Sequence, residues 1–277
     1  AASDVYKRQV FGQSKKVTIY SDNEYFSFDS SYDHNWKWDG SQKEWEIEND
    51  RKFSMPWQII PIYSEKEDLS RDVTKFIKAV GANVATIISL SNTDETMEAI
   101  RTITQNPNTF IFLKNICQIN FDLSNKNVIK IIRGEENIIS VQQNDKKSQQ
   151  WLVTEKKLLI PNYLRPLLID EKNFPEKLLE ATEIQLTLAA KIGEDGLSKL
   201  SDNDQRVFAY LPTEERKYDF PVLVNTSFLT TANRESLHID SNWNQWIFKE
   251  TAENIFEWIS ELVPVSYTHL TLPTILL

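Results

Sequence analysis

Glycine, cysteine and histidine are scarce in this chain. Its 277 residues include six glycines, one cysteine and three histidines. No glycine cluster matches GxGxxG or GxxxxGK[ST], so neither of these phosphate-binding loops is present. A single cysteine excludes a disulfide within the chain, and we expect Cys117, inside the apolar run FIFLKNICQINF, to be a buried thiol. His34, His238 and His269 have no second ligand at metal spacing, and we interpret His238 as a surface group before a helix.

Long apolar runs and excess basic charge are also missing. No run approaches the roughly 20 residues that span a bilayer, so we predict no membrane insertion. Whether a signal peptide once preceded this chain is left open by the sequence. The chain has 31 basic and 40 acidic residues and a formal net charge of −9, which is not the footprint of a nucleic-acid binder. A hydrophobic fraction of 40% supports the core of one large or two modest domains.

Both ends of the chain have an unusual origin. Residues 1–9 and the segment that begins at Val265 can be encoded by the same DNA read in opposite directions. That DNA resembles the transposase adapter of sequencing libraries. We therefore interpret residues 1–9 and 265–277 as translated adapter, and expect the natural part, about residues 10–264, to be open at both ends.

Hydrophobic periodicity predicts an α+β protein with two layers. KKVTIYSDNEYFSFD, residues 15–29, reads as a β-hairpin around Ser-Asp-Asn, and residues 30–53 read as an inserted loop. A strand over 82–92 and a helix over 94–104 follow. A turn-rich segment is expected over 162–175. Further strands are predicted over 110–121, 127–134, 138–143, 150–160, 180–192, 207–213 and 220–229.

The last predicted element is an amphipathic helix. Asp240, Ser241 and Asn242 offer N-caps at its start. The stripe expected to face the core consists of Trp243, Trp246, Ile247, Ile255, Phe256, Ile259 and Leu262.

Several other candidate sites have simpler structural interpretations. The pairs Glu214-Glu215 and Asp202-Asp204 lie in hydrophilic links, where we expect solvated loops rather than acid/base pairs. Asn225 fits a glycosylation sequon, but its position in a predicted strand argues against modification. Trp36, Trp38 and Trp45 are compatible with a ligand surface, and we favour a loop that folds these rings onto the core.

Two stretches carry a family resemblance. VFGQSKKVTIYSDNEYFSFD, residues 10–29, resembles the segment after the glycine-rich ATP lid in GHKL-type ATPases of the sacsin and NOV group, relatives of the heat-shock chaperone ATPases. VFAYLPTEERKYDFPVLVNTSFLTTANRESLHIDSNWNQWIF, residues 207–248, is similar to the group's F-x-LP-T strand, V-N-x-x-F, N-R-E turn and D-S-x-WN helix. Between them, residues 82–90 resemble the last strand of the ATPase domain. Residues 106–119 resemble the start of the next domain.

The resemblance implies a fold and a division of the chain. Residues 10–104 would be the C-terminal part of a GHKL α/β-sandwich ATPase domain, and residues 105–264 a β-rich two-layer α/β transducer, or middle-like, domain. The family's water-activating Glu, magnesium-binding Asn, Asp-x-Gly-x-Gly motif and lid glycines would all lie upstream of Val10. ATP and Mg²⁺ are therefore expected cofactors of a longer, cytoplasmic parent, and we expect neither to bind well to this chain.

The resemblance also implies one catalytic contact. Arg234 matches the position from which the second domain sends an arginine to the terminal phosphate of the nucleotide. A guanidinium is always charged and offers a planar fork to phosphate oxygens. Glu235 would orient Arg234, and Asn233 would shape the turn. The alternative is that Arg234 and Glu235 form an exposed pair at a helix approach, which contributes little.

Two classes of function remain open. The first is a nucleotide-driven, chaperone-like or defence-related ATPase that couples ATP binding and hydrolysis to interdomain movement. The second is a non-catalytic interaction scaffold whose ATPase half has decayed. Expected partners are the missing N-terminal half of the ATPase domain and a client protein, with neither nucleic acid nor membrane.

Overall fold

The chain folds into two compact units, residues 1–98 and residues 99–277. The predicted domain boundary, between residues 104 and 105, lies a few residues beyond this division, and helix α4 Thr93–Gln105 crosses the division. The domain assignments on either side stay predictions. The computed structural model describes residues 11–12, 14–90, 93–123, 126–171, 174–194, 196–201, 204–213, 220–231 and 236–269.

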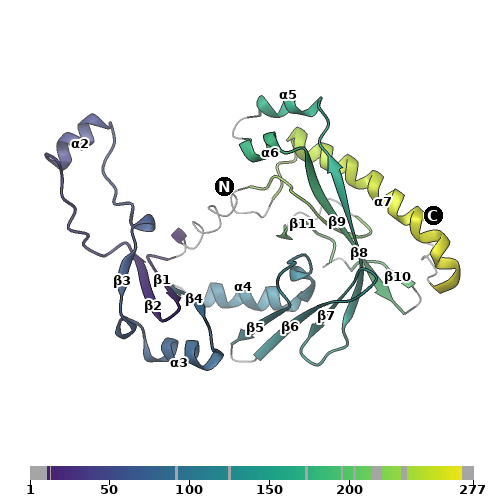
Figure 1. Cartoon of the computed structure of the whole chain (residues 1–277), viewed down its shortest axis with the longest axis horizontal. Helices are drawn as coiled ribbons and strands as arrows, with labels where there is room; N and C mark the ends of the chain where they lie inside the picture. The colour runs from purple at the N-terminus through teal and green to yellow at the C-terminus, as the bar shows by residue number, and fades with distance from the viewer. Residues whose placement is uncertain are drawn as a thin grey trace. The chain divides into compact units, whose positions relative to one another are not determined.

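A four-stranded antiparallel sheet forms the first unit (Figure 1). Its order is β3-β2-β1-β4. The predicted hairpin is confirmed, because β1 and β2 are joined by Asp22 and Asn23, whose φ angles of 48° and 70° suit a type I′ turn. The strand predicted over 82–92 is confirmed as β4. The strands are β1 Lys16–Ser21, β2 Glu24–Asp29, β3 Ile62–Ser64 and β4 Val84–Ser89, with short 3₁₀ turns η1 Trp57–Ile59 and η2 Lys66–Asp68.

Helix α3 Arg71–Val80 was not among the predicted elements, although the sequence carries its signals. The Ser70 side chain accepts a hydrogen bond from the Val73 N–H, and Gly81 ends the helix in the left-handed conformation with φ of 63°. Buried hydroxyls link three strands of the neighbouring sheet. Ser64 donates to Ser27 over 2.7 Å, and Ser27 shares a 2.7 Å hydrogen bond with Thr18.

An aromatic arm, residues 33–54, occupies the loop predicted between β2 and β3. It carries helix α2 Gln42–Glu48, none of whose residues is buried, at the end of a long excursion from the sheet (Figure 1). The ring of Phe53 contacts Trp36, Trp38 and Trp45 at centroid distances of 5.5, 4.6 and 5.6 Å. Trp36 remains 47% exposed. The expectation that these rings fold onto the core is wrong, because they pack around Phe53 instead.

We expect Phe53→Ala to loosen the aromatic arm selectively. Each ring contact stabilises by about 0.5–1.5 kcal/mol, so losing three should cost the arm about 2 kcal/mol. Hydrogen exchange over residues 33–54 should accelerate, whereas exchange in the second unit should not change. Ile47→Ala removes an apolar side chain that is already exposed, and it serves as the control. Unchanged exchange in Phe53→Ala would contradict a ring-centred arm.

The second unit contains a long, curved sheet. Its order is β12-β11-β13-β9-β8-β7-β6-β5, with β10 paired to β9, and every pairing except β11 with β13 is antiparallel. The predicted strands are confirmed in order, with the exceptions given below. The strands are β5 Gln118–Asp122, β6 Lys126–Arg133, β7 Ile138–Gln143, β8 Gln149–Leu159, β9 Glu183–Gly193, β10 Gly196–Ser198, β11 Val207–Ala209, β12 Leu211–Pro212 and β13 Leu223–Asn225.

Helix α7 Asn242–His269 covers one face of β8 and β9 (Figure 1). Leu158, Leu186 and Leu188 from this face are buried against the helix. The predicted stripe is largely confirmed, but Phe256 is 76% exposed and Trp258 is the buried residue at that level. Residues 255, 258, 259 and 262 follow helical spacing, whereas residue 256 falls off this face. Side chains beyond Leu262 lie outside the described residues.

The segment from 107 to 117 packs on the other face of the sheet. The strand predicted to begin at 110 is wrong, because Pro107–Phe110 form the 3₁₀ turn η3 and only β5 is a strand. Ile111 and Phe112 are buried by packing on the sheet face rather than by pairing with it. Cys117 is exposed, which corrects the expected buried thiol.

The segment predicted as turns over 162–175 contains a short helix, α5 Leu164–Ile169. Pro166 lies in its first turn, where a backbone N–H has no partner within the helix, so proline is tolerated there. A second short helix, α6 Glu176–Glu180, follows. The helix predicted over 94–104 is confirmed as α4. Among the described residues, no helix is long and apolar enough to cross a membrane.

Candidate functional site

The predicted catalytic turn is enclosed by a short hairpin stem, residues 229–231 and 236–238. Thr230 and Leu237 form an antiparallel bridge. The Thr231 N–H donates to the Ser236 carbonyl over 2.9 Å, and the His238 N–H donates to the Leu229 carbonyl over 3.0 Å. The predicted site residues Asn233, Arg234 and Glu235 lie outside the described residues. The stem therefore fixes where the segment 232–235 begins and ends.

Asn244 on α7 holds this stem with both ends of its amide. Its Nδ2 donates to the carbonyl oxygens of Leu229 over 2.8 Å and His238 over 2.9 Å. Its Oδ1 accepts from the Leu229 N–H over 2.9 Å. The side chain is fully buried, so no solvent competes for these bonds. The stem is thus attached to the first turn of α7 from both of its strands.

The start of α7 is capped twice. Ser241 accepts at its Oγ from the Trp243 N–H over 3.2 Å, which confirms one of the three predicted caps. Glu171 accepts from the Asn242 N–H over 2.6 Å and from the Ser241 hydroxyl over 2.8 Å. A carboxylate here also complements the positive end of the helix dipole. No local pattern in the sequence indicates Glu171, because it lies about seventy residues before the helix that it caps.

A cavity of about 660 Å³ lies beside the stem and the start of α7. Its lining includes two carboxylates and no lysine or arginine among the described residues. An anion in this cavity would be repelled unless a cation from the neighbouring turn compensates the charge. The lining consists of Glu171, Phe174, Pro175, Leu229, Thr230, Leu237, His238, Ile239, Asp240 and Ser241.

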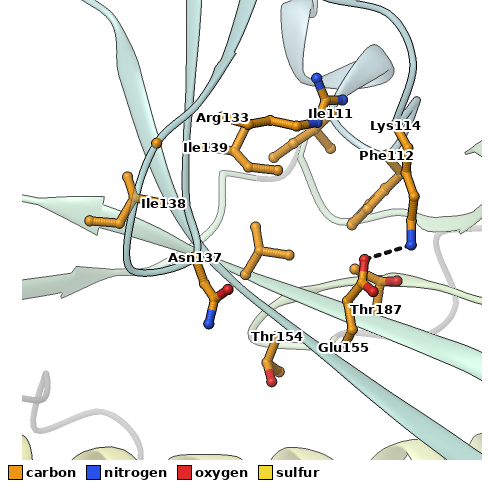
Figure 2. Close-up of a pocket in the computed structure, with 12 residues that line it drawn as sticks. Ile111, Phe112, Lys114, Arg133, Asn137, Ile138, Ile139, Thr154, Glu155 and Thr187 are labelled. Carbon is orange, nitrogen blue, oxygen red and sulfur yellow. Dashed lines mark ion pairs between the residues drawn. The ribbon is translucent and has the colours of Figure 1, made fainter.

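A second cavity, of about 440 Å³, lies on the sheet face opposite α7 (Figure 2). Two cations line it, but both are already engaged. Lys114 Nζ pairs with Glu155 over 2.7 Å. Arg133 donates to the Leu113 carbonyl over 2.5 Å and to the Ile116 carbonyl over 3.1 Å. Lys114 is thus paired with a carboxylate and the Arg133 guanidinium is held by two backbone carbonyls, so neither cation is placed as a catalytic group of this cavity.

The other candidates from the sequence have structural roles. Asp204 is buried, which corrects the expected solvated loop, and it accepts from Ser201 Oγ over 2.7 Å and Asn108 Nδ2 over 2.9 Å. Asn225 lies in a strand as predicted, and its Oδ1 accepts from the Tyr210 N–H. Asp202, Glu214 and Glu215 lie outside the described residues. Within the described part of the chain, no group of three or more His, Cys, Asp or Glu residues has metal-site geometry.

Comparison with known proteins finds one distant, partial similarity. The chain is 29% identical over 129 residues to Protein NO VEIN of Arabidopsis thaliana. The match covers 47% of this chain and 4% of NO VEIN. No family model and no solved structure matches. The similarity therefore indicates a distant relationship to a NO VEIN-type protein.

We expect Asn244→Ala to release the stem. The substitution leaves the buried Leu229 N–H without its partner, and the Leu229 and His238 carbonyls keep only their backbone donors, His238 N–H and Ser241 N–H. At about 1–3 kcal/mol for the unpaired N–H and about 0.5–1.5 kcal/mol for each lost bond to a carbonyl, the cost should be about 3 kcal/mol. Denaturant unfolding should show this loss, and amide exchange at Leu229 and His238 should accelerate. Gln245→Ala changes an exposed neighbour on the same helix and should stay within about 0.5 kcal/mol of the unchanged protein. Equal stability of the two variants would contradict the role of Asn244.

Proposed function

We propose that this chain belongs to a sacsin- and NOV-like protein that couples ATP binding and hydrolysis to interdomain movement, in a chaperone-like or defence-related role. Two findings support the proposal: the partial similarity to NO VEIN, and the ordered set of motifs that includes the N-R-E turn and ends in the D-S-x-WN helix. The observation that carries it furthest is the Asn244-held stem that presents this turn. The three bonds hold both strands of the stem that flanks residues 232–235, as a turn that contacts a phosphate would require.

Arg234 is the proposed catalytic residue. Its guanidinium would donate to the oxygens of the terminal phosphate and stabilise the negative charge that spreads over them during transfer to water. Glu235 would orient the guanidinium, and Asn233 would shape the turn. The carboxylates of the adjoining cavity would favour a positive charge at this position.

The stem supplies a route for coupling. Because Asn244 joins the stem to α7, a force on the turn would be transmitted to the helix and to the sheet face that the helix covers. Contact with a phosphate would therefore bias the position of the whole second unit rather than that of one loop.

The residues of this chain fit only part of an ATP site. The turn offers one cation, and none of the six glycines lies in a phosphate-binding pattern. The groups expected to hold adenine, magnesium and the attacking water would come from the proposed upstream segment. ATP with Mg²⁺ would supply the transferable phosphoryl group in that longer protein.

We expect the purified chain alone to hydrolyse no ATP. It lacks the residues that the resemblance assigns to water activation and magnesium binding. A coupled phosphate-release assay at millimolar Mg·ATP checks this, with Arg234→Ala as the control for contaminating ATPases. Turnover that is lost in Arg234→Ala would contradict the expectation that this chain holds only part of the site.

In a longer parent that includes the upstream segment, Arg234→Ala should lower kcat by about 10³-fold, as for arginines that stabilise phosphoryl transfer. Nucleotide Kd should change much less, because the charge matters most in the transition state. Arg234→Lys should restore only part of the rate, since it lacks the planar fork. Unchanged turnover in Arg234→Ala would remove the proposed role, and an inactive parent with no nucleotide binding would favour the interaction scaffold.

A further inference from the structure

Half of β8 is an edge of the sheet. Strand β7 pairs with β8 only from Gln149 to Leu152, and the last bond on that side runs from the Val153 N–H to the Asn137 carbonyl over 2.9 Å. Beyond this point β8 pairs with β9 alone, as far as Leu159. In an antiparallel pair, alternate residues direct their backbone groups to opposite sides. Ile160 donates to the β9 side, so residues 155, 157 and 159 direct theirs outward.

No described residue hydrogen-bonds these outward backbone groups. The open edge, residues 155–159, therefore presents a row of donors and acceptors about 13–17 Å long, at about 3.3 Å per residue. Leu159, at its end, is 73% exposed. Natural proteins usually protect such an edge, often with free lysines, because it templates pairing with another strand.

The lysines of this edge are not free to protect it. Lys157 pairs with Glu183 over 2.6 Å. Lys156 pairs with Glu257 over 3.1 Å and with Glu261 over 3.2 Å. The hydrogen bonds from Lys156 to Glu257 and Glu261 raise the pKa of Lys156 above its ordinary value, as expected for an ammonium group held by carboxylates. Two carboxylates against one lysine leave an excess of negative charge on the α7 side of the edge.

The opposite side of the edge leads into the cavity of Figure 2. Val153 and Glu155 line this cavity together with Ile111, Phe112 and Ile139. Figure 2 shows Phe112, Lys114 and Glu155 on one side of the cavity. Asn137, from the β6–β7 turn, and Ile138, the first residue of β7, lie on the other side. An apolar side chain that follows the line of β7 would enter this space.

We propose that the open edge of β8 binds an extended segment of a partner protein by strand addition, with lysine or arginine on one face and apolar residues on the other. Backbone bonds to residues 155, 157 and 159 hold the segment. Its basic side chains lie against Glu257 and Glu261, and an apolar side chain enters the cavity beside Phe112. This binding requires no nucleotide, so it stands independently of the proposed ATPase role.

The probe is a dye-labelled hexapeptide of alternating valine and lysine with blocked ends, measured by fluorescence anisotropy with the full chain. Lys157→Pro removes one outward N–H that no described strand uses, a place where edge strands tolerate proline. It should weaken binding by at least about tenfold. Lys157→Ala keeps the N–H and should bind as the unchanged protein does. Glu257→Gln combined with Glu261→Gln should weaken binding several-fold.

Two further peptides test the proposal on the unchanged protein, so the result does not depend on whether Lys157→Pro folds correctly. A peptide N-methylated on alternate residues loses its edge-facing donors and should not bind the unchanged protein. An alternating valine–glutamate peptide should bind at least about tenfold more weakly than the lysine peptide, because it faces the excess carboxylate. Absence of saturable binding, or equal binding of the methylated peptide, would overturn the proposal. Self-association that Lys157→Pro abolishes would assign the edge to a second copy and would also overturn it.

Discussion

The pairing of β8 with β9 is the constraint on which the second unit depends. Ten consecutive residue pairs, from Gln150 with Ile192 to Leu159 with Glu183, join the two strands. One face of this ladder carries Leu186 and Leu188 into the core beneath α7, and the other carries Trp151 and Ala189 into the core with Ile111 and Phe112. A slip of one residue would exchange the faces and expose both cores. The stem depends on this register through α7, whose Trp243 donates to the Ser227 carbonyl and whose Asn244 holds both stem strands.

The sequence was sufficient to predict those elements whose own residues carry a clear local pattern. The β1–β2 hairpin has alternation and a turn that accepts positive φ, and α7 has a cap and an apolar stripe. It could not predict where an apolar run packs without pairing, so residues 110–117 read as a strand and Cys117 as buried. Contacts between distant segments left no sequence signal: Glu171 caps α7, and Asn108 donates to Asp204 across 96 positions. The rings of the aromatic arm were expected to pack on the core, because composition alone does not show which aromatic side chains contact one another.

Some features of the candidate site are indicated by the sequence, and others are visible only in the structure. The N-R-E turn and the WN pair at residues 243–244 both belong to the family resemblance, but only the structure shows that Asn244 ties the stem to the helix. The neighbouring cavity carries carboxylates, so a cation in the turn would be the group that makes this surface accept a phosphate.

The open edge of β8 is a separate feature. It exists because β7 ends early, and the lysines of the edge are occupied by ion pairs. One unit would thus carry a nucleotide-responsive turn and a partner-binding edge on a common ladder.

In the proposed ATPase, residues 232–235 reach a nucleotide phosphate while Asn244 holds the stem on either side of them. The most direct measurement is a crystal structure of a longer parent protein, including the segment upstream of this chain, with Mg²⁺ and a non-hydrolysable ATP analogue. We predict that the Arg234 guanidinium lies within hydrogen-bond distance, about 2.7–3.2 Å, of a terminal phosphate oxygen. We also predict that the Asn244 bonds to Leu229 and His238 are intact. A bound nucleotide with Arg234 directed to solvent, or contacting only protein carboxylates, would contradict the proposed role of Arg234.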